Sequence, residues 1–471
     1  MKQKEFPKDV IINSDLPLDK QHQVKEILKQ FPHTLSDIPG KTDVIKHKIR
    51  VTDNTPFRIK QYPIPVHAQD AVEKEIDNMI ACDVIRPSDS PFCSPYTIVD
   101  KKCGNIRLCM DFRKLNSITV FDAEPIPTLP DLLLKLEGAK FFTRLDLTKG
   151  YFQIPLEEES RQLTAFQTSR GLYEFCYMPF GLNTASCSFQ KCMRKTLGHL
   201  KYVVFYFDDI LIYSNTWDEH LVHIKTTLKT LQDAKLTAKP SKACVGCTSL
   251  DFLGHVVSRG TISPDKAKTQ KIRDIQPPTT KKETRRILGL LSYYRSFVPN
   301  FSTIAQPLTD ITRKRSPNKI RWTKECQNSL DKIKEVLISE PILRVPVLSK
   351  PFIVQSDAST KGIGAVLLQE YNGTLLPCHY ASRRLLEREE HYAVCELECL
   401  ALVYALHTFS KYLLMKPFYI QIDHAGLSFL KQNKSKNARL TRWALSIQQY
   451  TFTVQHIKGT ANVVADFLSR H

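Results

Sequence analysis

The sequence predicts a multidomain α+β protein, and three observations support this. At roughly 150 residues per domain, 471 residues suggest about three domains. From residue 46 to 258, short apolar strand signals and helical signals alternate irregularly, without internal repeats. Near Pro351 the pattern changes to strand-like runs and a long helical run, in the order βββαβα…βα. This second pattern is typical of a compact domain with a mixed sheet.

Composition narrows the class of protein. Lys and Arg total 67 against 48 Asp and Glu, which gives a net charge of +19. A folded protein this basic is usually matched to a polyanion, most often a nucleic acid. No stretch approaches about 20 uncharged apolar residues, so no membrane partner is expected. The N-terminus has no apolar signal core. We therefore expect an intracellular protein whose 13 cysteines are reduced thiols.

Composition shifts and prolines divide the chain into five predicted parts. They are an N-terminal leader (1–45), an α+β region (46–258), a mostly helical region (259–320), a connector (321–349) and the C-terminal mixed-sheet domain (350–471).

Hydrophobic periodicity places the elements within these parts. The predicted helices are Lys20–Lys29, Val66–Cys82, Thr184–Gly198, Lys281–Phe297, Lys324–Ile338 and Ala393–Leu414. The predicted strands are Tyr96–Val99, Ile106–Met110, Phe141–Asp146, Tyr202–Phe207, Ile210–Tyr213, Phe352–Ser356, Ile363–Gln369, Leu375–Ala381, Phe418–Ile422 and Thr451–Ile457.

The sharpest local feature is an Asp-Asp pair, Asp208 and Asp209, between two apolar runs rich in β-formers. This pattern predicts a buried hairpin with both carboxylates at or near its turn. Aspartate is common in ordinary turns. However, two anions at the tip of a buried hairpin need a strong counter-charge, such as Mg²⁺.

A second apolar strand ends at Asp146. If it lies beside the hairpin, three carboxylates converge. That geometry suits two divalent cations about 3.5–4 Å apart, the arrangement used for phosphoryl transfer.

These residues lie in a sequence that resembles the reverse transcriptases of gypsy-class LTR retrotransposons. Tyr206-Phe207-Asp208-Asp209 resembles their YxDD box. The resemblance extends through Ser90–Asn116, Phe141–Leu156, Phe175–Gln190 and Asp251–Lys268, and covers almost all of residues 45–345. It implies a right-hand polymerase of fingers, palm and thumb.

The resemblance also implies roles for individual residues. Asp146, Asp208 and Asp209 would hold two Mg²⁺ ions, with Mn²⁺ as an alternative. Arg107 would grip the incoming triphosphate, with Lys102, or its neighbour Lys101, as a second contact. The residues implied at the sugar, the nucleotide pocket and the primer end are Tyr151, Phe180, and Leu253 with Gly254. The alternatives are a solvated surface for Arg107 and Lys102, and ordinary core for Tyr151 and Phe180.

The C-terminal domain carries a second set of acids: Asp357, Glu398, Asp423 and Asp466. Two of them end apolar strands. Glu398 shares a helical face with small residues, whereas Glu396 lies about 200° away, so both cannot point inward together. The set resembles the site of ribonuclease H domains, which implies a five-stranded mixed sheet with helices. The resemblance also implies a second two-Mg²⁺ site, with His456 assisting nearby rather than serving only a structural role.

Two further features leave alternatives open. Lys281, Lys282, Arg285 and Arg286 begin the expected thumb helix, where they either track phosphates or form a solvated face. Cys244 and Cys247 form a CxxC motif without a second metal-ligand pair nearby. This favours a pair of half-buried thiols at a strand start over a zinc site.

Together the resemblances imply an RNA-directed DNA polymerase with an associated ribonuclease H. Its expected partners are an RNA template, a DNA primer, RNA–DNA hybrid and dNTPs, with a protease and an integrase as further products of such a polyprotein. The expected location is the cytoplasm or a cytoplasmic virus-like particle, with the nucleus as an alternative. The rival hypothesis is a decayed or domesticated element that binds nucleic acid without catalysis. A third hypothesis keeps one of the two sites active.

Overall fold

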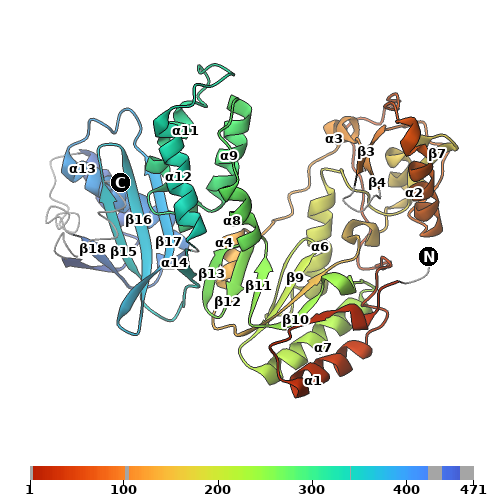
Figure 1. Cartoon of the computed structure of the whole chain (residues 1–471), viewed down its shortest axis with the longest axis horizontal. Helices are drawn as coiled ribbons and strands as arrows, with labels where there is room; N and C mark the ends of the chain where they lie inside the picture. The colour runs from red at the N-terminus through yellow and green to blue at the C-terminus, as the bar shows by residue number, and fades with distance from the viewer. Residues whose placement is uncertain (1–3, 101–105, 340, 423–437, 457–471) are drawn as a thin grey trace. The chain divides into compact units, whose positions relative to one another are not determined.

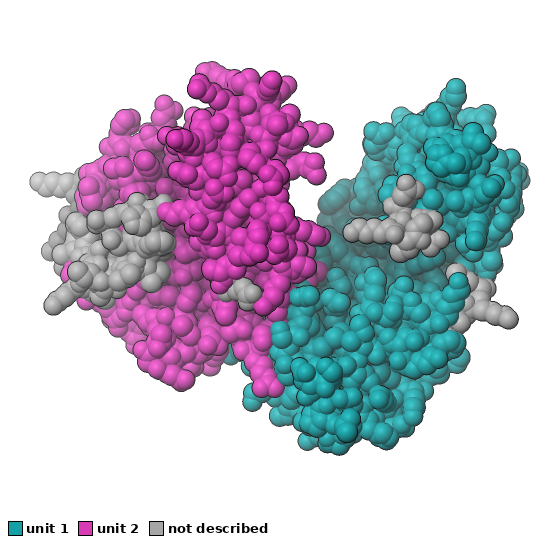
Figure 2. Space-filling view, in the orientation of Figure 1, with its two compact units in different colours: residues 1–252 teal, residues 253–471 magenta. Residues whose placement is uncertain are grey.

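The computed structural model describes residues 4–100, 106–339, 341–422 and 438–456 (Figure 1). The chain divides into two compact units, residues 1–252 and 253–471 (Figure 2). Within the described residues no helix has the length and apolar character needed to cross a membrane.

The first unit is built on a five-stranded sheet in the order β1-β10-β5-β9-β8. Its strands are β1 (Ile11–Ile12), β5 (Phe141–Asp146), β8 (Val203–Tyr206), β9 (Asp209–Ser214) and β10 (Cys244–Cys247). Valine, isoleucine and aromatic residues fill them, as suits a pleated, half-buried surface. The helices α1 (Leu18–Lys29), α6 (Ala185–Leu197) and α7 (Trp217–Asp233) belong to the same unit, and α7 contacts both of the other two as well as β5 and β9.

The N-terminal segment is built into this sheet. β1 pairs in parallel with β10, with Ile11 opposite Cys244. α1 packs on α7, where the indole N–H of Trp217 donates to Gln23 Oε1 at 2.9 Å. Part of the segment predicted as a leader therefore supplies an edge strand and a covering helix to the sheet that carries the Asp-Asp hairpin.

The rest of the first unit contains two smaller sheets. β2 (Ile85–Pro87), β6 (Phe166–Thr168) and β7 (Gly171–Phe175) form one, and β3 (Tyr96–Asp100) and β4 (Ile106–Met110) form an antiparallel hairpin. The remaining helices are α2 (Gln69–Ala81), α3 (Arg113–Ile118), α4 (Leu129–Leu134) and α5 (Glu158–Arg161).

The second unit begins with the strands β12 (His255–Ser258) and β13 (Thr261–Pro264), which pair with each other. β13 also pairs with β14 (Leu343–Arg344), far along the chain. Residues 259–320 are mostly helical, as expected, but they also contain the strand β13. This strand gains a second partner, β14, from the segment predicted as a connector. The helices are α8 (Lys266–Arg273), α9 (Lys281–Tyr293), α10 (Phe301–Ile304), α11 (Gln306–Asp310) and α12 (Lys324–Ile338).

The predicted five-stranded mixed sheet is confirmed, in the order β17-β16-β15-β18-β19. β15–β16 and β16–β17 are antiparallel, whereas β15–β18 and β18–β19 are parallel. The predicted helix Ala393–Leu414 is interrupted at Phe409. The elements are β15 (Ile353–Ala358), β16 (Gly362–Tyr371), β17 (Thr374–Arg384), α13 (Val394–Thr408), α14 (Ser410–Leu413), β18 (Phe418–Ile422), α15 (Ala438–Ile447) and β19 (Phe452–His456).

One buried amide ties the first unit together. The Gln153 side chain donates to the carbonyl oxygens of Thr148 and Thr237 at 2.8 and 2.9 Å, and accepts from the Thr237 N–H at 2.8 Å. Thr237 in turn donates through its hydroxyl to the Ile38 carbonyl. Gln153 thus joins the loop after β5 to the chain after α7 and to the N-terminal segment.

We predict that Gln153→Ala lowers the free energy of unfolding by about 3 kcal/mol, because it leaves buried backbone groups without partners. Urea unfolding should show a lower midpoint with an unchanged slope. The control is Gln162→Ala, since that exposed side chain makes one long hydrogen bond of 3.4 Å. Equal losses in the two variants would contradict this role of Gln153.

Candidate active sites

Strand pairing brings the first set of carboxylates together. In the β5–β9 ladder Asp146 lies directly opposite Asp209. Asp208 lies in the turn between β8 and β9, as the sequence predicted. The turn requires a φ of +53° at Phe207, a left-handed conformation that is costly for a residue with a side chain. The Phe207 N–H donates to Gln190 Oε1 of α6 at 3.2 Å, which holds the turn in this conformation.

The carboxylates are electrostatically strained in the absence of a cation. Burial raises the pKa of Asp208 above its usual value, and the charge of Asp146 raises it further. The pKa of Asp209 is raised by burial and then by the charges of Asp208 and Asp146. Lys242, which precedes β10, places its ammonium 2.8 Å from both oxygens of Asp146. The site thus concentrates negative charge and offsets part of it with one lysine.

These donors suit a hard divalent cation, although the side chains do not form a ready-made ligand cage. In the described part of the chain, no group of three or more His, Cys, Asp or Glu side chains is arranged to hold a metal ion. Asp146 is paired with Lys242 instead. Carboxylate oxygens are the ligands that Mg²⁺ uses in proteins. Burial and mutual repulsion make the charged forms of Asp208 and Asp209 costly, so the donor set fits a divalent cation such as Mg²⁺.

Aromatic side chains line the same end of the sheet. The Tyr151 ring lies 4.8 Å from that of Phe180 and 5.3 Å from that of Phe189, and its hydroxyl pairs with Ser186 Oγ at 3.1 Å. Burial raises the pKa of Tyr151, and the Asp208 charge adds to this. Phe180 is 46% exposed, so the ordinary-core interpretation of Phe180 is wrong. Tyr151 and Phe180 therefore form a half-open aromatic surface beside Asp208.

Gly150 allows this close packing. A Cβ atom at Gly150 would lie 2.9 Å from the Phe189 ring and 3.3 Å from Asp208 Cβ. Any larger residue would push the Asp208 turn away from α6.

Arg107 lies on β4 opposite Val99, with its side chain exposed. Lys102 and the alternative Lys101 lie outside the described residues.

In the second unit, Leu253 and Gly254 adopt φ values of +48° and +76° at the start of the β12–β13 hairpin. The hydroxyls of Tyr293 and Tyr294, in the last turn of α9 and just after it, donate to the carbonyls of Leu253 and Gly254. The His255 ring packs on both tyrosines. The sequence did not point to this anchor, because the tyrosines are 40 residues away.

The expected thumb cations separate into two kinds. Lys281 is buried and donates to the carbonyls of Lys314 and Ser316 at 3.3 and 3.0 Å. The prediction that Lys281 binds phosphates or faces solvent is therefore wrong, because this cation holds the loop before α12. Arg285 is exposed but donates to the Thr312 carbonyl. Lys282 and Arg286 are exposed on α9.

The C-terminal acids that the structure describes are buried. Asp357 on β15 is 7% exposed and Glu398 on α13 is 8% exposed. α13 packs against β15 and β16, and Ala401 and Ala405 on the face of Glu398 are fully buried. These small residues let the helix approach the sheet closely, as expected.

Glu396 lies on the same helix as Glu398. It is also buried, at 9% exposure. One of its oxygens accepts from the Ala393 N–H and the other from Arg439 on α15, at 3.0 and 2.9 Å. Glu396 and Glu398 are thus both buried although they lie about 200° apart around the helix, because α15 packs on α13 and its Arg439 pairs with Glu396.

His456 is exposed at the end of β19, opposite Ile422, the last residue of β18. Asp423, which follows Ile422, and Asp466 lie outside the described residues. Beside this edge, Gln355, Gln421 and Gln455 are joined by side-chain hydrogen bonds of 2.7 and 3.1 Å across β15, β18 and β19.

The first unit also contains a basic groove that the sequence did not reveal. We use this name for a cavity of about 470 Å³ between α6 and an extended stretch, residues 45–50. Phe121, which is 76% exposed, also lines it. Its cations are Lys46, Lys48, Arg50, Lys191 and Lys195.

The folding of the extended stretch explains the groove. Burial alternates along it, so that Lys46, Lys48 and Arg50 are exposed while His47 and Ile49 are buried. His47 Nδ1 pairs with Ser188 Oγ of α6 at 2.7 Å. Burial lowers the pKa of His47 to about 4, so the ring is neutral at pH 7. Lys191 lies three residues after Ser188 on α6 and projects into the same cavity.

Two family models match this chain. Residues 98–257 match the reverse transcriptase (RNA-dependent DNA polymerase) model, and residues 347–450 match the RNase H-like domain found in reverse transcriptase.

Three similar relatives are the Pol polyproteins of transposons 297, opus and gypsy of Drosophila melanogaster. They are 40%, 36% and 37% identical over 91%, 98% and 98% of this chain. The matched regions are 41%, 48% and 46% of those polyproteins, so the chain spans less than half of their length.

Solved structures with the same fold include foamy viral protease-reverse transcriptase. Its complex with dsDNA has a TM-score of 0.88 at 22% identity, covering 98% of this chain and 99% of that one. Its complex with RNA/DNA hybrid has a TM-score of 0.81 at 22% identity, covering 98% of this chain and 64% of that one. The chain thus combines a reverse transcriptase domain with an RNase H-like domain, and it is similar over more than 90% of its length to Pol polyproteins of gypsy-class retrotransposons.

Proposed function

We propose that this chain is an RNA-directed DNA polymerase with an associated ribonuclease H. The observation that carries the proposal is the register of β5 and β9, which sets Asp146 opposite Asp209 and beside Asp208. The family matches at both ends of the chain support the same function. The polymerase would extend a primer 3′-hydroxyl with dNTPs, and the ribonuclease H would cleave the RNA of the resulting hybrid.

In the polymerase site, Asp146, Asp208 and Asp209 would hold Mg²⁺, with Mn²⁺ as an alternative. When bound, the metal would lower the pKa of the attacking hydroxyl and neutralise charge on the leaving pyrophosphate. Lys242 would then exchange its contact with Asp146 for the incoming anionic substrate. Gln190 would keep the Phe207 turn, and with it Asp208, in place throughout.

We also propose nucleotide and primer contacts. We assign the triphosphate to Arg107, with Lys102 as a second contact, because a guanidinium forks onto phosphate oxygens. Tyr151 and Phe180 would pack under the sugar and base, since Tyr151 borders Asp208 and the Phe180 ring packs on that of Tyr151. Leu253 and Gly254 would support the primer end.

The second candidate site would use Asp357, Glu398, Asp423 and Asp466 to hold Mg²⁺, with His456 nearby. Burial of Asp357 and Glu398 makes their charged forms costly without a cation. RNA–DNA hybrid is the proposed substrate of this domain. We place the protein in the cytoplasm or in a cytoplasmic particle.

The basic groove would hold the backbone of the template strand. Alternate residues of an extended chain are about 6.6 Å apart, a spacing of the same order as that between successive phosphates in an extended strand. Lys46, Lys48 and Arg50 repeat in this way along one wall, and Lys48 alone of the three pairs with a described carboxylate, that of Glu157 at 3.2 Å. Phe121 offers an exposed ring on which a base can stack.

The alternative is a decayed element that binds nucleic acid without catalysis. The basic groove is consistent with this alternative. The carboxylates argue against it, because all seven acids of the two candidate sites are present in the sequence.

We predict that single carboxylate changes separate the two activities. Asp208→Asn should reduce dNTP incorporation on a primed RNA template at least 10³-fold and leave hybrid cleavage intact, because removing a metal ligand removes the charge that stabilises the transition state. Asp357→Asn should instead reduce hybrid cleavage and leave dNTP incorporation intact. Primer extension and cleavage of labelled hybrid, measured on the same preparations, check both.

Asp89→Asn is the control, since Asp89 is exposed and lies outside both sites. Incorporation that survives Asp208→Asn would refute the polymerase site. Absence of both activities in the wild type, with hybrid binding retained, would support the decayed element.

We predict that Asp208 changes the melting temperature, Tm, in opposite directions without and with Mg²⁺. Tm is measured in an Asp357→Asn background, which removes a proposed metal ligand of the second site. The folded pKa of Asp208 is raised, so its destabilising effect is absent below the ordinary aspartate pKa and grows as pH rises through the folded pKa. At pH 7 without metal, Asp208→Asn should therefore raise Tm by about 1–2 °C after allowance for solvent screening. Near pH 3 the difference should vanish.

Mg²⁺ should reverse this order, because it stabilises the folded state that binds it. It should raise the Tm of the Asp208 protein more than that of the Asn variant. Equal shifts with Mg²⁺ would show that Asp208 is not a ligand.

We predict that the double change Lys191→Ala with Lys195→Ala weakens binding of a primed template. The slope of log affinity against log salt should fall by about 2, since each lysine removes about one phosphate contact. Fluorescence anisotropy over a salt series measures the slope. Lys225→Ala with Lys229→Ala on α7 is the control with the same charge change; equal slopes in the two double variants would exclude the groove.

A further inference from the structure

Two thiols meet on β10, the strand that pairs with β5. The Sγ atoms of Cys244 and Cys247 are 2.9 Å apart. Residues three apart in a regular strand point to opposite faces of the sheet. Here the β10–β5 register shifts between the two cysteines. The bulge brings both sulfurs to the same side, so their contact is built into the strand.

Gly246 makes the bulge possible. Its φ is +73°, in the left-handed region that favours glycine. A Cβ atom there would lie 2.6 Å from Leu16 Cδ1 and 3.2 Å from the Trp217 ring. The Gly246 N–H donates to Thr143 Oγ1 of β5. Packing on two sides therefore fixes the backbone that joins the two thiols.

The two sulfurs differ in their surroundings. Cys244 is half-buried and lies opposite Arg144 on β5, whereas Cys247 is only 6% exposed. The pKa of Cys244 falls to about 7, because the Cys247 thiol hydrogen-bonds to it and Arg144 contributes positive charge. The pKa of Cys247 is raised. Cys244 is thus the accessible nucleophile and Cys247 the partner behind it.

We propose that Cys244 and Cys247 form an oxidisable dithiol site, which hydrogen peroxide converts into an intramolecular disulfide. The Cys244 thiolate attacks the peroxide, the O–O bond breaks, and Cys244 becomes a sulfenic acid as hydroxide leaves. Cys247 then attacks Cys244 Sγ and displaces the second hydroxide. The two sulfurs lose two electrons in total, the peroxide gains them, and the hydroxides leave as two waters with the thiol protons.

The disulfide would act on the neighbouring polymerase site, a consequence that rests on the proposed function. Since a disulfide bond is about 2.05 Å long, the sulfurs must approach by about 0.9 Å from their 2.9 Å separation. Lys242, two residues before Cys244, holds Asp146. A shift of the first residue of β10 therefore moves the lysine that neutralises the metal ligand.

Peptide mapping tests the dithiol on the full chain. Protein treated with equimolar hydrogen peroxide is denatured, alkylated and digested with trypsin, which releases both cysteines in residues 243–259. We expect the mass of this peptide to fall by two hydrogens. Its thiols should become resistant to alkylation at least ten times faster than that of Cys82, a half-buried thiol of the same unit. Dithiothreitol should restore both thiols.

Variants define the outcomes. Cys244→Ser should prevent formation of the disulfide-linked peptide. If serine disturbs the fold, Cys244→Ala serves as a second variant. Cys82→Ser should leave disulfide formation unchanged. Oxidation of Cys82 at the same rate, or Cys244 ending as a sulfinic acid without the disulfide, would overturn the proposal.

Primer extension tests the consequence. Peroxide should lower incorporation by the wild type at least fivefold, reversibly, and leave Cys244→Ser unaffected. Full activity of the oxidised protein would overturn the link to the polymerase site. Absence of incorporation by every reduced protein would instead refute the proposed function, whereas the mass measurement is independent of it.

Discussion

The pairing of β5 with β9 is the constraint on which the proposed polymerase site depends. A strand presents alternate residues to opposite faces, so a slip of one residue would carry Asp146 to the other side of the sheet. Buried side chains on both strands prevent the slip, with Leu145 opposite Ile210 and Thr143 opposite Ile212. Hydrophobic burial along the ladder therefore determines where the carboxylates lie.

The same strand pairing brings like charges together, which has an electrostatic cost. Neighbouring strands position the lysine that offsets part of this cost. Burial, and then the neighbouring negative charges, raise the pKa values of Asp208 and Asp209, and Lys242 offsets part of that charge. Lys242 is positioned by β10, which is in turn paired on its outer side with β1. A strand from the N-terminal segment thus contributes, through β10, to the electrostatics of a site more than 100 residues away.

The sequence predicted what local pattern controls. Apolar runs gave the strands that end at Asp146 and flank Asp208, and the order of elements gave the mixed sheet of β15 to β19. It did not predict Lys242, Gln190 or Tyr294, because each acts on a partner distant in the chain. Lys281 was misjudged for a related reason: a buried charge is tolerated once distant carbonyls pair with it.

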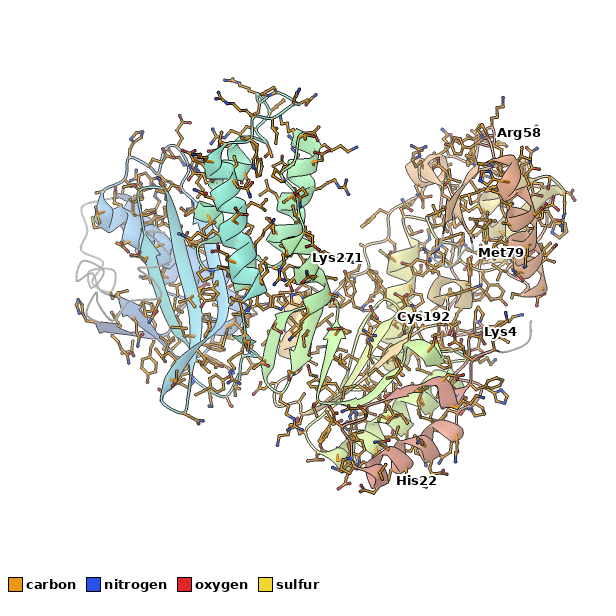
Figure 3. The ribbon with its side chains drawn as sticks, viewed as in Figure 1. Lys4, His22, Arg58, Met79, Cys192 and Lys271 are labelled. Atoms are coloured by element: carbon orange, nitrogen blue, oxygen red, sulfur yellow. The ribbon has the colours of Figure 1, made fainter. Side chains whose placement is uncertain are left out.

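The helix α6, on which Figure 3 labels Cys192, contacts both the turn that carries Asp208 and the basic groove. Gln190 faces the turn that carries Asp208, whereas Ser188 and Lys191 face the basic groove. Residues 188 and 190 are separated by about 200° around a helix, so they point to opposite sides. The same helix therefore borders the groove and holds the turn that carries Asp208. Because α6 is buried along most of its length, a displacement on one side is transmitted to the other rather than absorbed.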